Sequence, residues 1–149
     1  VITNPPPEEF DSVYERADGS LQTWEGHLSF RRGFQDLSDE EKATVLHAVV
    51  ADQRVHKLTI QGIGLSDGDA NIVATAVESS ESLTVLNFSH NDIREHGASR
   101  LADAFERNTV VREMYLFDNA ISLMGRRRLA EAKVAARQQE GRVHAILCY

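Results

Sequence analysis

Metal coordination is the first chemistry that the sequence suggests, because His90, Asp92 and His96 lie close together. Imidazole nitrogens and carboxylate oxygens are common zinc ligands. We expect His90 to face outward at the end of a strand, whereas His96 should lie in the first turn of the following helix. The two side chains then point in different directions. We therefore predict solvent-exposed histidines and no metal site.

Phosphate binding is a second possible chemistry. Gly62, Gly64 and Gly68 lie between an expected strand and an expected helix, where phosphate-binding turns occur. Their spacing is GxGxxxG, whereas dinucleotide-binding turns have the spacing GxGxxG. Equivalent turns further along the chain carry Asp92 and Ala120 at the position of Gly64. We predict no nucleotide site and no cofactor.

Nucleophilic catalysis has little support in the sequence. Cys148 is the only cysteine, so no internal disulfide can form, and a reducing intracellular compartment is expected. The cytoplasm and an organelle interior are not distinguished. Cys148 falls at an inward strand position, where a thiol behaves as a small hydrophobic group. No Ser/His/Asp or Cys/His set is supported, and we predict no catalytic residues.

Positive charge is concentrated near the C-terminus of an otherwise acidic chain. The net charge is −7, which argues against general nucleic-acid binding. Arg126, Arg127 and Arg128 are consecutive, and further cations follow at Lys133, Arg137 and Arg142. Such a run is usually a solvated helix face. Because the rest of the chain is acidic, we include the three consecutive arginines as candidates for binding an acidic partner or a second copy.

An internal repeat determines the elements that position these residues. Its copies begin at Val55, Leu83 and Val111, spaced by 28 residues, and read VHKLTIQGIGL, LTVLNFSHNDI and VREMYLFDNAI. Apolar residues recur at the first, fourth, sixth and eleventh places, which is the pattern LxxLxLxxNxL. Asn91 and Asn119 occupy its asparagine position. Ile63 replaces asparagine in the first copy, so we expect one rung of that side-chain ladder to be missing.

The second half of each copy predicts a helix. Its apolar positions in two successive copies are Val73, Ala74, Ala76, Val77 and Leu101, Ala102, Ala104, Phe105. Their spacing places them on one helix face. Ser66 and Ser122 are placed to cap helix starts. Each unit is therefore a short strand, a turn and a helix.

The end units depart from the pattern. Upstream, the spacing aligns Phe30 with Leu58, and Ser38 with Glu41 predicts a capping box. Downstream, a longer helix is expected from about Leu123 to Gln139. We divide the chain into an extended and short-helical capping segment (1–26) and a repeat domain (27–149). The units of that domain are 27–54, 55–82, 83–110 and 111–142, followed by a terminal strand at 143–149.

The repeats resemble the ribonuclease-inhibitor-like class of leucine-rich repeats. The resemblance covers roughly residues 27–149 and is strongest over 55–121. It implies an α/β fold: a short right-handed solenoid with a parallel β-sheet on the concave side and α-helices on the convex side. The class includes ribonuclease inhibitor, sensor regions of immune receptors, Ran GTPase-activating protein and the tropomodulin C-terminal domain. Most members bind proteins.

The concave surface carries the predicted binding residues. Strand residues between the inward ones point out of the sheet, and near its C-terminal end they become aromatic and apolar. This set consists of Glu113, Tyr115, Phe117, Leu147 and Tyr149. Aromatic clusters are common anchors of protein interfaces.

The sequence thus predicts a non-catalytic protein–protein interaction module, a scaffold or accessory subunit of a larger assembly. A tropomodulin-like actin-capping module is an alternative. GTPase activation of the Ran type is an alternative of another class, for which Arg94 is an available turn residue. No apolar stretch is long enough for a membrane span. The strand from Val143 to Tyr149 should leave one edge unpaired, so self-association there is a further expectation.

Overall fold

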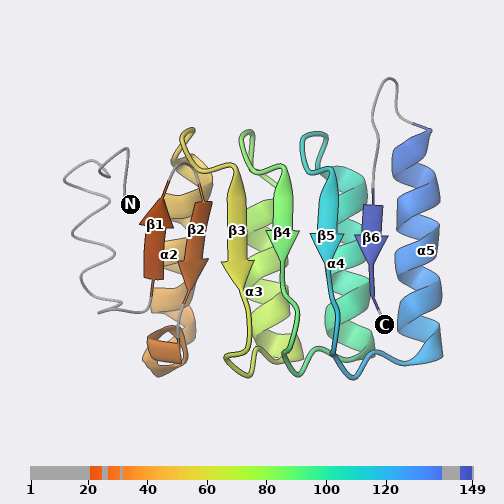
Figure 1. Cartoon of the computed structure of the whole chain (residues 1–149), viewed down its shortest axis with the longest axis horizontal. Coiled ribbons are helices and arrows are strands. Elements are labelled where there is room, and N and C mark those ends of the chain that lie inside the picture. The colour runs from red at the N-terminus through yellow and green to blue at the C-terminus, as the bar shows by residue number, and fades with distance from the viewer. Residues whose placement is uncertain (1–20, 25–26, 31, 139–144, 149) are drawn as a thin grey trace.

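The computed structural model describes residues 21–24, 27–30, 32–138 and 145–148. Its elements, in chain order, are β1 (Leu21–Trp24), β2 (His27–Phe30), the 3-10 helix η1 (Arg32–Asp36), α2 (Asp39–Ala51), β3 (Lys57–Ile60), α3 (Asp67–Val77), β4 (Val85–Asn87), α4 (Glu95–Arg107), β5 (Glu113–Tyr115), α5 (Leu123–Arg137) and β6 (Ala145–Leu147). The strands form one sheet in sequence order, and the helices pack against one of its faces (Figure 1).

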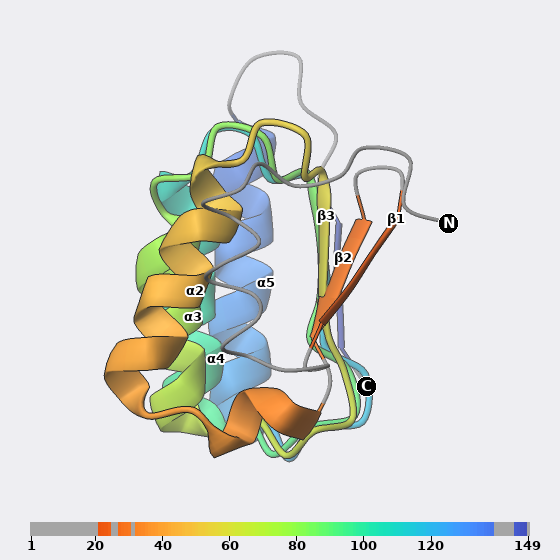
Figure 2. The ribbon, with the colours of Figure 1, turned by 90° about the vertical axis from the view of Figure 1, so that its left-hand side faces the viewer.

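The predicted leucine-rich-repeat architecture is confirmed. Strands β2 to β6 are parallel, and each is connected to the next by one of the helices α2 to α5. Strand β1 was not predicted, and it pairs antiparallel with β2. Figure 2 shows this pair tilted relative to the later strands. None of the helices in the described part of the chain is long and apolar enough to cross a lipid bilayer.

The predicted alignment of the first unit was wrong by two residues. Phe30 pairs with Ile60 instead of Leu58. The helix starts keep the 28-residue spacing, since Ser38 and Ser66 are both N-cap residues. The extra residues therefore lie in the connection between β2 and α2, where η1 forms. Phe34 of η1 is fully buried and stacks on Phe30, with 4.5 Å between ring centroids.

The core lies between the sheet and the helix layer. Inward strand residues are buried as predicted, and Leu86 and Leu116 are each only 1% exposed. Expected caps are also present: Ser38 and Ser66 form capping boxes with Glu41 and Asp69. On α4 the N-cap residue makes no side-chain cap.

Equivalent positions bring each helix against the next. The fourth helical position of one helix faces the third position of the following helix, and the pairs are Lys42 with Asp69, Ala70 with Gly97, and Ala98 with Gly125. A Cβ atom added to Gly97 would lie 3.2 Å from the Ala70 Cβ, and one added to Gly125 would lie 3.4 Å from the Ala98 Cβ. The first junction is therefore a buried ion pair, and the next two are close contacts of small residues.

Candidate protein-binding surface

The face of the sheet turned away from the helices carries the predicted binding residues. Glu113, Tyr115, Phe117 and Leu147 form what we call the sheet-face patch. Tyr115 pairs with Leu147 across β5 and β6. The rings of Tyr115 and Phe117 are tilted by 36°, with centroids 6.1 Å apart. All four side chains are partly exposed. Tyr149, predicted to join them, lies outside the described residues.

A hydrogen bond orients the aromatic ring at the middle of the patch. The Tyr115 hydroxyl donates to Glu113 Oε2 at 3.0 Å. This hydrogen bond, with partial burial and the nearby negative charge, raises the pKa of Tyr115. The phenol therefore stays neutral at physiological pH, and the patch combines a fixed aromatic ring with a carboxylate at its edge.

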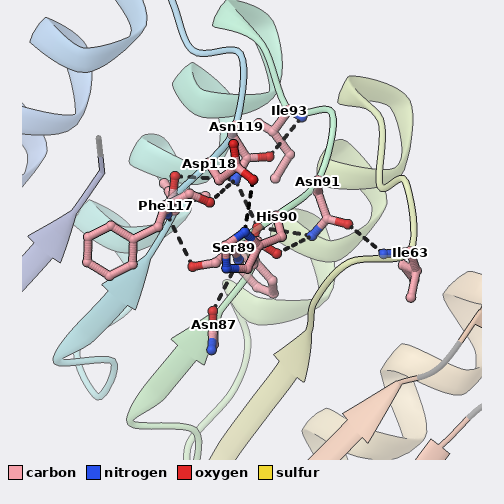
Figure 3. A network of polar contacts seen from close by, with 11 residues as sticks. Ile63, Asn87, Ser89, His90, Asn91, Ile93, Phe117, Asp118 and Asn119 are labelled. Atoms are coloured by element: carbon pink, nitrogen blue, oxygen red, sulfur yellow. Dashed lines mark hydrogen bonds and ion pairs between the residues drawn. The ribbon is translucent and has the colours of Figure 1, made fainter.

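Backbone hydrogen bonds hold Phe117 at the end of β5 (Figure 3). Its N–H donates to Ser89 Oγ at 3.1 Å, and its carbonyl accepts from the His90 N–H at 2.7 Å. The next residue, Asp118, has a φ of 54°, and His90 has a φ of 60°. His90 Nδ1 lies 3.0 Å from Asp118 Oδ2. These contacts fix the sharp turns that present the phenylalanine.

Asn91 forms the rung of the predicted ladder that joins its own turn to the turn of the preceding unit. Its Oδ1 accepts from the N–H groups of Ile63 and Leu65, at 3.1 and 3.0 Å. Its Nδ2 donates to the carbonyls of Ile60 and Phe88. Asn119 bonds the Ile93 N–H and the Phe88 carbonyl of the unit before it in the same way. Ile63, at the equivalent position of the first copy, has no side-chain amide with which to make this rung, as predicted.

The N-terminal half of the same sheet face is polar and bonded within itself. His27 Nε2 lies 2.7 Å from Thr59 Oγ1, and Asn87 Nδ2 donates to Gln61 Oε1 at 3.1 Å. Burial, and then the charge of Lys57, lowers the pKa of His27, so this imidazole is neutral at pH 7. This half of the sheet face is therefore polar, whereas the sheet-face patch is mainly aromatic and apolar.

The structure does not bring the three predicted arginines together. Arg128 turns toward α4, where it bonds Glu106 at 2.7 Å and Asp103 at 2.6 Å. The hydrogen bond that Arg128 donates to Glu106 is the main cause that raises the pKa of Arg128 above its ordinary value. Arg126 and Arg127 are exposed on α5. Arg128 stabilises the packing of two helices, and all three lie in the helix layer, away from the sheet-face patch.

The structure also shows where the residues considered for metal binding, phosphate binding and nucleophilic catalysis lie. His90 pairs with Asp118, and His96 is exposed on α4. No group of three or more His, Cys, Asp or Glu side chains in the described ranges is arranged to hold a metal ion. Gly62 and Gly64 have φ values of 68° and 81°, a conformation that explains glycine there without a ligand. Cys148 packs against the core, and burial raises its pKa.

Sequence reasoning missed a second polar ladder, at the turns that lead from helix to strand. Asn108 donates to the carbonyls of Val77 and Ser80 and accepts from the N–H groups of Val110 and Val111. The signal was present, because Asp52, Ser80 and Asn108 are turn-forming residues at the same 28-residue spacing.

Two solved structures share this fold at low sequence identity. One is leiomodin-1 actin-binding site 2, with a TM-score of 0.72 and 14% identity over 96% of this chain and 80% of that chain. The other is the tropomodulin C-terminal domain of Caenorhabditis elegans, with a TM-score of 0.55 and 18% identity over 88% and 95% of the two chains. No protein-family model and no curated protein matches the sequence. The likeness establishes the leucine-rich-repeat-like fold, and the ribonuclease-inhibitor-like class remains a prediction.

Proposed function

We propose that the chain is a non-catalytic protein-binding module that binds actin through the sheet-face patch. The patch itself is the observation that carries a protein-binding role. Tyr115, the last residue of β5, and Phe117, just after the strand, lie side by side, and aromatic side chains held in this way lose little conformational entropy on binding. The adjacent Glu113 carboxylate gives the surface an acceptor for a polar or cationic group of the partner.

Actin is the partner that the structural likeness favours. The similar structure of leiomodin-1 is named as an actin-binding site, and the likeness extends over nearly all of this chain. A scaffold or accessory-subunit role in a larger assembly would use the same surface with another partner. No contact in the described structure favours that role over actin binding.

A GTPase-activating role has weaker support. Such a role needs an exposed asparagine or arginine beside the sheet. The side-chain amides of Asn91 and Asn119 are occupied by backbone groups of the turns. Arg94, the N-cap residue of α4, is exposed, and its backbone N–H donates to Asp67. One exposed arginine in a turn is common and does not by itself indicate this activity. We therefore propose that the chain performs no chemistry of its own.

Phe117→Ala tests the proposal directly. We expect the variant to lose on the order of 2 kcal/mol of binding free energy, about a 30-fold weaker affinity, if Phe117 is an anchor. Folding should change little, since the side chain lies on the sheet face opposite the core. Co-sedimentation with actin filaments measures the affinity, and circular dichroism checks the fold.

Gln61→Ala is the matched control, because Gln61 follows β3 at the position that Phe117 occupies after β5. It lies on the polar half of the sheet face and should leave affinity nearly unchanged. Equal binding by wild type and Phe117→Ala would place the actin contact elsewhere. Absence of binding by the wild-type chain would contradict actin as the partner.

A further inference from the structure

Among the described elements, no helix packs against the outer face of α5. Every large hydrophobic side chain that is exposed among the described residues lies on this helix: Leu123 is 82% exposed, Met124 60% and Val134 57%. Figure 1 shows α5 at the end of the helix layer, next to β6. Clusters of exposed apolar side chains on one element mark interaction surfaces.

The small-residue junction that joins α3 to α4 and α4 to α5 cannot form on this face. Arg126 stands where Ala70 and Ala98 receive the glycine of the next helix, so the close approach is blocked. Leu123 stands where two acidic residues contact the start of the next helix. Asp67 accepts from the Arg94 N–H at 2.6 Å, and Glu95 accepts from Ser122 Oγ at 3.3 Å. The partner of α5 must therefore pack without the glycine contact that joins α3 to α4 and α4 to α5.

The exposed residues of α5 form one helical stripe. Leu123, Arg127, Glu131 and Val134 follow each other at spacings of four, four and three residues, which places them on a common face. A shallow depression of about 420 Å³ lies along it, lined by Arg127, Ala130, Glu131, Val134, Ala135 and Gln138. The small side chain of Ala130 leaves room for another helix to approach.

The stripes of two antiparallel copies of α5 are complementary to each other in charge and in apolar contacts. If two copies of α5 cross antiparallel about a point near residue 129, Met124 of each copy meets Val134 of the other. In the same arrangement Arg127 of each copy meets Glu131 of the other. Two-fold interfaces require this kind of reciprocity, in which one residue contacts a second and the second contacts the first.

We propose that the outer face of α5 is a two-fold interface between two copies of this chain, formed by antiparallel α5 helices. Charge complementarity favours a second copy over an acidic partner, because the stripe carries both signs. Within one chain Arg127 Nε lies 3.7 Å from Glu131 Oε1, and both side chains are well exposed. Such a surface pair contributes little, so both groups are available to pair across the interface. This contact is distinct from the self-association that the sequence predicted at the strand edge.

Charge reversal at the interface provides the test. Sedimentation equilibrium of the full chain, from about 1 µM to about 1 mM, should show a reversible dimer. Arg127→Glu places Glu opposite Glu, and Glu131→Arg places Arg opposite Arg. Each variant alone should have a dissociation constant raised by more than about tenfold, because like charges would face each other twice.

Mixing the two variants should restore the dimer as a heterodimer, since every facing pair is then of opposite sign. The double variant should dimerise like the wild type. Arg112→Glu is the matched control, because it makes the same charge change at an exposed position away from α5. Its dissociation constant should stay within about threefold of wild type. A wild-type chain that stays monomeric, a dimer indifferent to Arg127→Glu, or a mixture that fails to associate would each overturn the proposal.

Discussion

At the scale of single residues, the buried ion pair of Lys42 and Asp69 is the contact most sensitive to the loss of one partner. Their side chains are only 7% and 10% exposed, and Lys42 Nζ lies 2.8 Å from Asp69 Oδ1. Lys42 also donates to Gln35 Oε1 at 2.9 Å. Burial alone would raise the pKa of Asp69, but hydrogen bonds from Lys42, the Ser66 N–H and Gln35 outweigh it and lower the pKa. Each charged group thus has hydrogen-bond partners in addition to the other, which is the condition for tolerating buried charge.

Asp69→Asn should destabilise the fold by about 3 to 5 kcal/mol at pH 7, because it leaves the Lys42 ammonium buried without a counter-charge. The folded-state pKa of Asp69 lies below its unfolded value of about 4, so its contribution is present above that pH and is lost as the pH falls through the folded pKa. The difference in unfolding free energy between Asp69→Asn and wild type should therefore narrow as the pH falls below about 4. Urea unfolding at several pH values measures it. A cost independent of pH would mean that the carboxylate charge is not responsible.

At the scale of elements, two glycines set the distance between helices. Gly97 and Gly125 are the third residues of α4 and α5, and each lies against an alanine of the preceding helix. Added Cβ atoms would also come within 2.9 Å of Ile93 Cγ2 and 2.7 Å of Ile121 Cγ2, respectively. Glycine is required here by packing, although it lowers helix propensity.

Gly125→Ala should destabilise the protein by about 1 to 3 kcal/mol, the usual cost of overpacking, despite the better helix propensity of alanine. Gly68→Ala on α3 is the matched control, since its added Cβ would lie 3.8 Å from Ser66 Oγ with nothing closer. That variant should be as stable as wild type or up to about 1 kcal/mol more stable. Chemical denaturation of both variants compares them. Stabilisation by both substitutions would show that helix propensity, and not the close approach of the helices, determines the effect.

The elements show which parts of the fold could be predicted. Strand and helix positions followed from the 28-residue apolar pattern, because the core fixes that pattern. Strand β1 left no such signal, since Leu21 and Trp24 are three residues apart and β1 is defined by its antiparallel pairing with β2. The longer connection through η1 was equally hidden, because it depends on Phe34 finding space beside Phe30.

The candidate site was predictable to a similar extent. Alternation along β5 placed Glu113, Tyr115 and Phe117 on one sheet face, and the register of Leu147 followed from the longer last helix. The inward turn of Arg128 could not be predicted. Its partners Glu106 and Asp103 lie 22 and 25 residues earlier in the sequence. Only the packing of α5 on α4 brings these side chains close to Arg128.

At the scale of the whole molecule, each unit is stabilised by its neighbours, so local damage should spread. Leu86→Ala in β4 should destabilise the protein by about 2 to 5 kcal/mol, the cost of emptying a core leucine site. Trp24 is the only tryptophan and lies in β1, several strands away from Leu86. Denaturant melts followed by its fluorescence and by helical circular dichroism should shift together. A tryptophan transition that stays in place would show that the units unfold separately.

The different helix junctions also determine the order in which units can stack. If the chain skipped the unit of α4 during folding, Gly125 would meet Ala70, a pairing as small and neutral as the native one. If it skipped the unit of α3, Gly97 would meet Lys42, and the ammonium would be buried with no carboxylate beside it. Such a misassembled stack would carry the cost of an unpaired buried charge. The alanine–glycine junctions are alike, so they cannot distinguish one neighbouring helix from another. The ion pair of Lys42 and Asp69 can, because in the repeat series α3 alone brings a carboxylate to Lys42 of α2.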